Sequence, residues 1–526
     1  MTKDNTCNNS KCAAFTEKLY AMMSKKKFLS TLIFAALFTF LFYRQGLGIN
    51  LLIAEFTLII YLFATRQIVL KGFLNISIFL LLITSLLFTL MVHSKFVFVM
   101  HFVVLFSFVG TLIFSQSKSV LTTLALAVSN VFSAQFNLVQ AFGQTKIRGS
   151  KVGHILWRLK IYLIPILIIS IFLLIYRNSN PAFDQIYAKI KKFIGQLFGN
   201  LVEFIEIHGL ITFITCLLIS AFFILRAEQE DIINEDQNAS DELIRKRKTK
   251  VKTNKNYSLK NEYKAAVFLF VSLNIILLFL NYLDIQYVWF GFSWEDQFLK
   301  DFVHQGTYLL VISIVIAVGL VLYFFRNNLI FFSKNKLLKV LSYIWLAQNA
   351  LLVFSVAQRN HIYIKHYALA YGRIGVYIFL ILALFGLFTV YLKIQKTKSN
   401  FFLWRINALS ALFVLTFSAF FNWDVIIAKY NFKQANKSFL HLEFLAKLSD
   451  KALPFLDYSI EELTQMEHVQ HSMFSFKRHY STPYEFKMHI TEKKISFMRR
   501  WENQSWLSWN YAEFVAYEEL KKKKRK

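Results

Sequence analysis

The sequence predicts an all-α fold: a polytopic transmembrane helical bundle of about eleven spans, followed by a small, mostly helical extramembrane region. Several apolar stretches, among them 73–92, 96–115, 306–325 and 374–392, approach the roughly 20 residues that a helix needs to cross about 30 Å of hydrocarbon. Hydrophobic residues make up 56% of the 526 positions, a larger share than in a typical soluble domain. With only 4 Pro and 16 Gly, few breaks interrupt the helices.

The formal net charge of +29 is explained by a membrane environment rather than by binding to a nucleic acid. Lys and Arg lie mostly at the ends of the apolar stretches, where positive charges hold loops on the cytoplasmic side and long basic side chains reach the headgroups. The lipid bilayer is therefore the partner that the charge pattern predicts, and no nucleic-acid partner is expected.

No motif predicts a cofactor or a metal. The three cysteines, Cys7, Cys12 and Cys216, form no disulfide framework, and Cys7 and Cys12 have no nearby histidine to complete a zinc site. His468 and His471 lie three positions apart, but no HExxH motif or cysteine ligand accompanies them. The sequence also has no GxxxxGK[S/T], GxGxxG or GxSxG motif, so ATP-driven transport and hydrolase chemistry through those motifs are unsupported.

Residues 1–27 form an N-terminal segment that its lysines place in the cytoplasm. An N-terminal membrane half, 28–225, follows it. Its expected spans are 28–43, 50–64, 73–92, 96–115, 161–176 and 210–225. The stretch 120–143 is apolar but diluted by polar residues, and counting it as a span would put the basic residues after it outside. We expect it to be re-entrant, interfacial or buried among other helices.

Residues 226–264 form a charged cytoplasmic linker between the two membrane halves. It is acidic from 228 to 242 and basic from 245 to 264, and it lacks aromatic residues before Tyr257. This composition predicts a solvated linker. Its basic part would either attract anionic lipid or simply fix the topology.

In the C-terminal membrane half, 265–421, apolar spans again alternate with polar connecting segments. Its expected spans are 265–283, 306–325, 338–357, 374–392 and 401–421. An odd number of spans places the tail, 422–526, on the extracytoplasmic side. The basic run at 521–526 would favour the cytoplasm, but long extramembrane segments translocate largely regardless of charge.

Glu55 and His101 are ionisable residues inside expected spans, where such groups mark function unless a partner satisfies them. Both lie roughly 8 Å below the outer face at a rise of about 1.5 Å per residue. The matching depth predicts a pair that serves as a proton relay or cation site, or that only joins helices. The neutral polar residues Asn274, Gln348 and Asn349 are expected to form interhelical hydrogen bonds.

A dense basic and aromatic segment is expected to form an outer loop at 359–373. Its candidate ligand-binding residues are Arg359, His361, Tyr363, His366, Tyr367 and Arg373. Such a cluster would hold a phosphate, a lipid headgroup or a glycan carboxylate. The alternative is an interfacial aromatic belt without a ligand.

Several short stretches between residues 155 and 454 resemble one bacterial family of multi-span membrane proteins. They are Pro165 with Asn180-Pro181-Ala182-Phe183; Tyr282-Leu283; Val303-His304-Gln305-Gly306; Arg359, Tyr363-Ile364, Tyr367, Leu369 and Arg373; and Asp424, Ile427, Tyr430, Asn431, Leu448-Ser449-Asp450 and Pro454. The family is a domain of unknown function, number four-one-seven-three, related to number four-one-five-three. The resemblance implies a membrane bundle in the bacterial inner membrane and implies no activity. Ala370 departs from the expected turn, and the tail beyond Pro454 has no counterpart.

Three classes of function remain open from the sequence. The first is a non-enzymatic protein of the cytoplasmic membrane, a scaffold, sensor or binding protein with an envelope protein or glycan as partner. The second is a proton- or ion-coupled secondary transporter that uses Glu55 and His101, although no internal repeat supports it. The third is a membrane transferase acting on a lipid-linked glycan, with the 359–373 cluster facing the periplasm. The sequence favours the first class.

Overall fold

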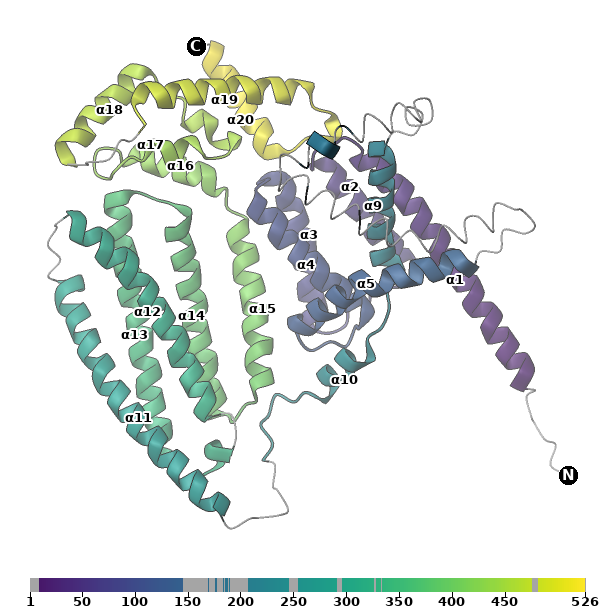
Figure 1. Cartoon of the computed structure of the whole chain (residues 1–526), viewed down its shortest axis with the longest axis horizontal. Helices are drawn as coiled ribbons and strands as arrows, with labels where there is room; N and C mark the ends of the chain where they lie inside the picture. The colour runs from purple at the N-terminus through teal and green to yellow at the C-terminus, as the bar shows by residue number, and fades with distance from the viewer. Residues whose placement is uncertain are drawn as a thin grey trace.

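The computed structural model describes residues 9–144, 207–245, 254–290, 296–325, 328–332, 334–474 and 481–525, with a few single positions between 169 and 189. Helices dominate these residues, and the only β-pairing among them is an isolated bridge between Glu242 and Lys398. The predicted all-α class is confirmed. Figure 1 shows two groups of membrane helices side by side, with the C-terminal helices lying across one end of them.

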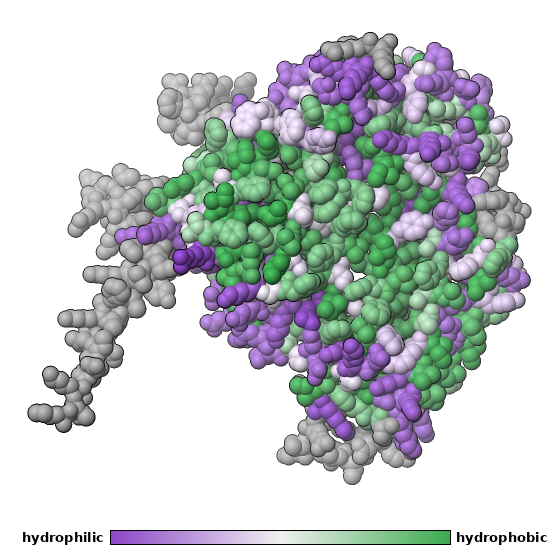
Figure 2. Space-filling model, turned by 180° about the vertical axis from the view of Figure 1, so that it is seen from behind, coloured by the Kyte–Doolittle hydropathy of each residue, from purple (hydrophilic) through white to green (hydrophobic). Residues whose placement is uncertain are grey.

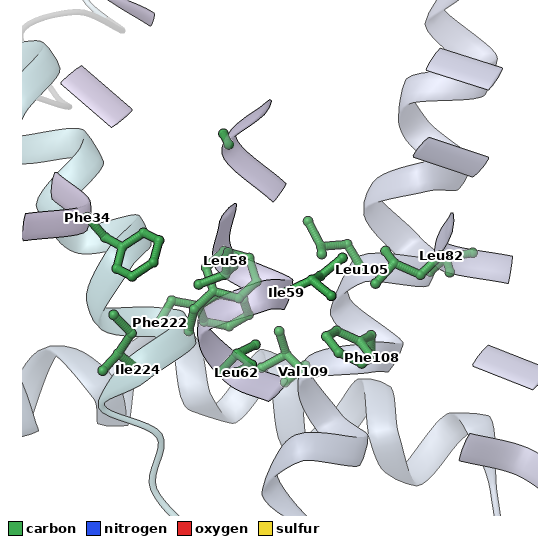
Figure 3. Packing of buried hydrophobic residues seen from close by; sticks show 14 of the residues in the cluster. Phe34, Leu58, Ile59, Leu62, Leu82, Leu105, Phe108, Val109, Phe222 and Ile224 are labelled. Carbon is green, nitrogen blue, oxygen red and sulfur yellow. The ribbon is translucent and has the colours of Figure 1, made fainter. Parts of the chain in front are cut away.

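The first bundle gathers the N-terminal helices around one apolar core. Its helices are α1 (Asn9–Phe42), α2 (Ile49–Ala64), α3 (Phe73–Met91), α4 (Lys95–Ile113), α5 (Val120–Gln144) and α9 (Ile207–Ile224). Leu58 and Leu62 of α2, Phe108 of α4 and Phe222 of α9 meet in this core (Figure 3). The apolar stretches therefore pack on one another as well as facing lipid.

Helix α5 uses the polar residues that dilute its sequence. Asn130 Nδ2 donates to the carbonyl of Phe222 at 2.8 Å, and Asn137 Nδ2 donates to that of Leu225 at 3.0 Å. These two carbonyls lie at the C-terminal end of α9, where a helix leaves carbonyls without partners. Helix α5 runs across the neighbouring helices (Figure 1) and is not among those apolar enough to span a membrane. It is thus a helix packed on α4 and α9, as one of the three expectations for 120–143 allowed.

The second bundle contains the C-terminal membrane helices. They are α11 (Asn254–Asp284), the π-helix η1 (Ile285–Trp289), α12 (Asp296–Phe324), the 3₁₀-helix η2 (Asn328–Phe331), α13 (Lys336–Tyr367), α14 (Tyr371–Gln395) and α15 (Asn400–Ala419). Phe270, Trp345 and Leu352 lie in its core. Helix α15 packs on α14 and also on α3, α4 and α5, so it joins the two bundles.

The apolar helices make this chain a multi-pass membrane protein. Among the described residues, 6 helices are long and apolar enough to cross a membrane, and α2, α9 and α12 contain shorter apolar segments. The expected span 161–176 lies largely outside the described residues. Figure 2 shows a broad apolar band between a more polar cap and a polar opposite end, as a protein surrounded by lipid requires.

The acidic part of the linker is mostly exposed, as its charge predicted, but it is folded and attached to the first bundle. This part forms α10 (Glu230–Asn238), and Asp236 is only 3% exposed. Asp236 accepts hydrogen bonds from the backbone of Lys118 at 2.8 Å and from the hydroxyl of Thr122 at 2.7 Å. Unpaired donors at the start of α5 thus hold this carboxylate against the first bundle. Much of the basic part, for which anionic lipid was the expected partner, lies outside the described residues.

The same linker also reaches the second bundle. Leu243 N–H donates to the carbonyl of Thr397 at 3.0 Å, and Ser399 N–H donates to that of Asp241 at 2.9 Å. Asp241 forms an ion pair with Arg405 of α15. The segment therefore ties the two bundles together at the end opposite the C-terminal helices.

The described residues from 422 to 525 form a helical layer, hereafter the cap, which confirms the predicted small helical region. It contains α16 (Trp423–Lys433), α17 (Leu442–Ala446), the 3₁₀-helix η3 (Asp450–Phe455), α18 (Ile460–Met473), α19 (Pro483–Asn503), the 3₁₀-helix η4 (Trp506–Ser508) and α20 (Tyr511–Arg525). Capping boxes at Ser459 and Thr482 start α18 and α19. Phe486, Ile490 and Phe497 of α19 give the cap its own core.

Backbone contacts fasten the cap to both bundles. Ile49 N–H donates to the carbonyl of Trp509 at 3.0 Å, and Leu369 N–H donates to Asn431 Oδ1 at 2.8 Å. At Gly48 two backbone segments approach so closely that a Cβ on this glycine would lie 2.5 Å from the carbonyl carbon of Ser508. The cap therefore covers the ends of the helices at the turns before α2 and α14.

Gly110→Ala should destabilise the first bundle. A Cβ at Gly110 of α4 would lie 2.0 Å from the carbonyl oxygen of Thr123 in α5, so the helices must separate. We expect a loss of about 1–3 kcal/mol in the free energy of unfolding, measured in detergent micelles. Gly319→Ala in α12 is the matched control, because a Cβ there meets no atom within 4 Å. Equal stability of the two variants would contradict the close crossing of α4 and α5.

Candidate functional site

A pocket of about 810 Å³ lies where the cap meets the membrane helices, and we call it the cap pocket. Its walls come from the turn between α3 and α4, the start of α14, and parts of α16, η3, α19 and α20. Its lining residues are His93, Ser94, Lys95, Phe96, Tyr371, Ile374, Gly375, Ile378, Trp423, Asp424, Lys447, Leu448, Ser449, Asp450, Lys451, Lys493, Arg500 and Glu513. A volume of this size is typical of small-molecule sites.

Asp424 organises one side of the cap pocket. The hydroxyls of Tyr371 and Ser449 each donate a hydrogen bond to its carboxylate, and the ammonium nitrogen of Lys451 lies 3.6 Å from Oδ2. Both carboxylate oxygens are therefore engaged. Asp424 fixes its three neighbours in place and is not a free base.

Lys451 joins the cap to the first bundle. This side chain is 4% exposed, and its ammonium donates to the carbonyls of Val92 at 2.8 Å and His93 at 3.1 Å. Burial lowers the pKa of Lys451 from its ordinary value, and the charge of Asp424 opposes that shift. Burial likewise lowers the pKa of His93. The turn between α3 and α4 is thus bound to the cap by a buried cation.

A second group of charges comes from α19, α20 and η3. Arg500 Nη2 lies 2.9 Å from Asp450 Oδ2 and 3.0 Å from Glu513 Oε1. Lys493 Nζ lies 3.9 Å from Asp450 Oδ1 and donates to backbone carbonyls of the cap, among them that of Ala446 at 3.2 Å. Burial lowers the pKa of Lys493, while the charge of Asp450 opposes the shift. Asp450 and Glu513 are therefore already paired with cations.

The net charge of the cap pocket is positive. Five Lys and Arg side chains line it against three carboxylates. Lys95, at the first position of α4, has no hydrogen-bond or ion-pair partner in the described part of the chain. Lys447 pairs with Glu443 at 2.6 Å, a carboxylate that lies outside the pocket lining. Lys95 and Lys447 can thus contribute positive charge to a ligand.

The remaining wall of the cap pocket is apolar. Phe96 comes from α4, Ile374 and Ile378 come from α14, and Trp423 comes from α16. The indole of Trp423 donates to the carbonyl of Ser418 at 2.8 Å, so its polar group is satisfied by the protein. The pocket therefore combines cations on the cap side with an uncharged surface on the membrane side. This arrangement suits a ligand that carries both an anionic group and an apolar part.

The structure brings Glu55 and His101 together inside the first bundle. Glu55 Oε1 lies 2.7 Å from His101 Nε2, with exposures of 5% and 0%. His101 Nδ1 lies 3.0 Å from the hydroxyl of Ser85, which donates to the carbonyl of Leu82 at 3.1 Å. The other oxygen, Oε2, has no partner among the described residues. Neither Glu55 nor His101 lines the cap pocket, so the pair is a separate feature whose role in function stays a prediction.

The prediction of an outer loop at 359–373 is wrong. Helix α13 continues through the first part of it to Tyr367, because Asp284 at the end of α11 forms a buried ion pair with Arg359. Ser355 also donates to Asp284 Oδ2 at 2.6 Å. With its charge neutralised, Arg359 can lie inside the helical bundle. Only residues 368–370 interrupt the helices before α14 begins at Tyr371.

Three of the six candidate ligand residues of that segment, Tyr363, Tyr367 and Arg373, lie together, and the ring centroids of the two tyrosines are 4.7 Å apart. Arg373 lies over the ring of Tyr363 at 4.5 Å and donates to the carbonyls of Tyr367 and Ala368. The remaining members fall elsewhere: Arg359 pairs with Asp284, the side chain of His361 is exposed, and the backbone of His366 accepts from the cap. None of the six lines the cap pocket. Arg359, Tyr363, His366 and Tyr367 share one face of α13, whereas His361 lies on another.

The cap pocket was not predicted from the sequence. Its charged residues are spread from Lys95 to Glu513, so no local pattern connects them. One signal was available. Asp424, Ser449 and Asp450 belong to the stretches that carried the family resemblance, and all three line the pocket. Within the described residues, no group of three His, Cys, Asp or Glu side chains could hold a metal ion.

Glu55→Leu should destabilise the first bundle, because His101 Nε2 would lose its partner inside the membrane. We expect a loss of about 1–2 kcal/mol in the free energy of unfolding. Glu55→Gln is the matched control, since its amide can still donate to the ring nitrogen, and its loss should be less than half as large. Denaturation by graded addition of sodium dodecyl sulfate measures both. Equal losses would show that the hydrogen bond does not hold α2 and α4 together.

The described fold and pocket can be set beside known proteins. No curated protein and no solved structure matches this chain. A family profile described as "Domain of unknown function (DUF4153)" matches residues 28–458, which include both bundles and the first part of the cap. The match ends close to Pro454, where the sequence resemblance also ends. The sequence resemblance was to number four-one-seven-three, with four-one-five-three as its relative, and the profile shows that the chain belongs to the DUF4153 family.

Proposed function

We propose that this membrane protein is a non-enzymatic binding protein of the bacterial cell envelope that recognises an anionic ligand in the cap pocket. The observation that carries the proposal is the composition of the pocket wall, five cations against three carboxylates beside an apolar surface. Asp424, Asp450 and Glu513 are engaged by neighbouring donors, while Lys95 has no partner among the residues that the structure describes. An incoming phosphate or carboxylate would gain charge-assisted hydrogen bonds there.

Binding fits the cap pocket better than catalysis. A transferase acting on a lipid-linked glycan would need an available acid or base, and Asp424 already accepts two hydroxyl hydrogen bonds beside Lys451. Arg359, His361, His366 and Arg373, on which the transferase hypothesis relied, do not line the pocket. We therefore propose no reaction for this site.

A secondary transporter is the second candidate, and the contact between Glu55 and His101 is the observation that favours it. Buried ionisable pairs inside bundles serve proton relays in many transporters. The pair lies outside the cap pocket, so it offers no route for the ligand proposed here. Proton-coupled uptake into vesicles that disappears in Glu55→Gln would favour transport over binding.

We place the protein in the bacterial cytoplasmic membrane, with its N-terminus inside and the cap on the extracytoplasmic side. Basic residues at the helix ends opposite the cap support this orientation under the positive-inside rule. They include Lys25, Lys26, Lys27, Arg66, Lys71, Lys118, Lys334, Lys336, Lys396 and Lys398. The cap would then face the partners of the cell envelope.

Single-cysteine variants should report this orientation. With the three native cysteines replaced by serine, Ser472→Cys on the exposed surface of α18 should react with a membrane-impermeant maleimide in intact spheroplasts. Lys396→Cys, exposed at the opposite end of α14, should react only after permeabilisation. The reverse pattern would place the cap in the cytoplasm.

Removing two lining cations should weaken anion binding. We expect Lys95→Ala combined with Lys447→Ala to raise the Kd for glycerol 3-phosphate roughly tenfold, which corresponds to about 1.4 kcal/mol. Isothermal titration of the purified full chain in detergent provides the measurement. Lys437→Ala is the matched control, because Lys437 is exposed on the cap but does not line the pocket. A Kd that the double variant leaves unchanged, or an equal loss in the control, would overturn the proposed function.

A further inference from the structure

One face of α14 leads from the cap pocket into the membrane. Tyr371, Ile374, Gly375 and Ile378 line the pocket, and their spacing of three, four and seven positions places them on one side of the helix. Ile378 lies about 10 Å along the axis from Tyr371, at a rise of about 1.5 Å per residue. Because α14 is one of the helices apolar enough to span a membrane, this face continues into hydrocarbon.

The pocket is open beside α14 at Gly375. This glycine is exposed, and a Cβ built on it would meet no atom within 4 Å. The wall therefore has free space about one turn into α14. A chain-like group lying beside α14 would fill that space without displacing protein atoms.

Helix α4 brings a cation and an aromatic ring to the same edge. Lys95 and Phe96 occupy its first turn, and both line the pocket. Lys95 is exposed and has no protein partner in the described ranges. A lysine at a helix end can hold its ammonium at the headgroup level while its methylene stem lies along apolar surface. Lys95 and Phe96 would thus contact the anionic and apolar parts of a ligand at adjacent depths.

We infer that the ligand of the cap pocket is a membrane lipid with an anionic phosphate headgroup, which enters sideways from the bilayer between α4 and α14. The inference rests on the proposed function and specifies its ligand class. The phosphate lies among the lining cations, with Lys95 as the partner at the membrane edge. An acyl chain lies along Ile374, Gly375 and Ile378. A soluble anion would use the cations and leave this apolar face of the pocket unoccupied.

The test compares a lipid with its soluble headgroup on the purified full chain. Native mass spectrometry in detergent measures the binding of dioctanoyl phosphatidylglycerol, and isothermal titration measures the binding of glycerol 3-phosphate. The unmodified protein should bind the lipid at least tenfold more tightly than glycerol 3-phosphate. Dioctanoyl phosphatidylcholine, which carries no net charge, should bind at least tenfold more weakly than phosphatidylglycerol.

Gly375→Phe is the diagnostic variant, because its ring would occupy the free space beside α14. We expect the preference for lipid over glycerol 3-phosphate to fall at least tenfold, and a graded, smaller fall in Gly375→Leu. Gly372→Phe is the matched control: a Cβ at Gly372 also meets no atom within 4 Å, yet the residue does not line the pocket. Its preference should equal that of the unmodified protein.

The outcomes separate the inference from the proposed function. Binding of glycerol 3-phosphate as tight as that of the lipid, with no change in Gly375→Phe, would overturn the lipid and leave an anion-binding protein. Equal binding of phosphatidylcholine would also overturn the recognition of an anionic headgroup. If the unmodified protein binds neither phosphatidylglycerol nor glycerol 3-phosphate, the proposed function itself is overturned.

Discussion

Hydrocarbon offers no hydrogen-bond partners, so an ionisable group that the chain carries into the membrane is stabilised by a partner within the protein. This constraint fixes the arrangement of both bundles. Glu55 of α2 meets His101 of α4 in the first bundle, and Asp284 of α11 meets Arg359 of α13 in the second. Each contact joins helices that apolar packing alone would hold in several registers. These ionisable residues, whose burial in a membrane costs free energy, therefore specify which helices are neighbours.

The same constraint operates where the cap meets the membrane. Lys451 is buried at that junction, and the carbonyls of Val92 and His93 together with the carboxylate of Asp424 satisfy its charge. Lifting the cap would break these contacts and expose the apolar residues beneath it. The cap is accordingly an integral part of the molecule, and the pocket under it has charged walls that the protein itself holds in position.

The mixed character of the pocket follows from its place between two solvents. Helix α14 must be apolar because it crosses the membrane, and so it presents Ile374 and Ile378. Helix α19 lies in the cap, where Lys493 and Arg500 can remain charged. Neither element alone would discriminate an anionic amphiphile from other molecules. Their meeting produces a surface with both properties.

The sequence by itself determined the class of the protein, its long apolar helices and its small helical cap, because hydrophobicity and helical period are local properties of the chain. It also placed Glu55 and His101 at one depth, since the rise per residue is constant. Tertiary structure decided the rest. Asp284, which lies far from Arg359 in sequence, draws Arg359 away from the expected cluster, and Thr122 helps to bury Asp236 of the linker. The cap pocket depends on residues from Lys95 to Glu513. Such contacts are set by the packing of distant segments, on which the local sequence carries no information.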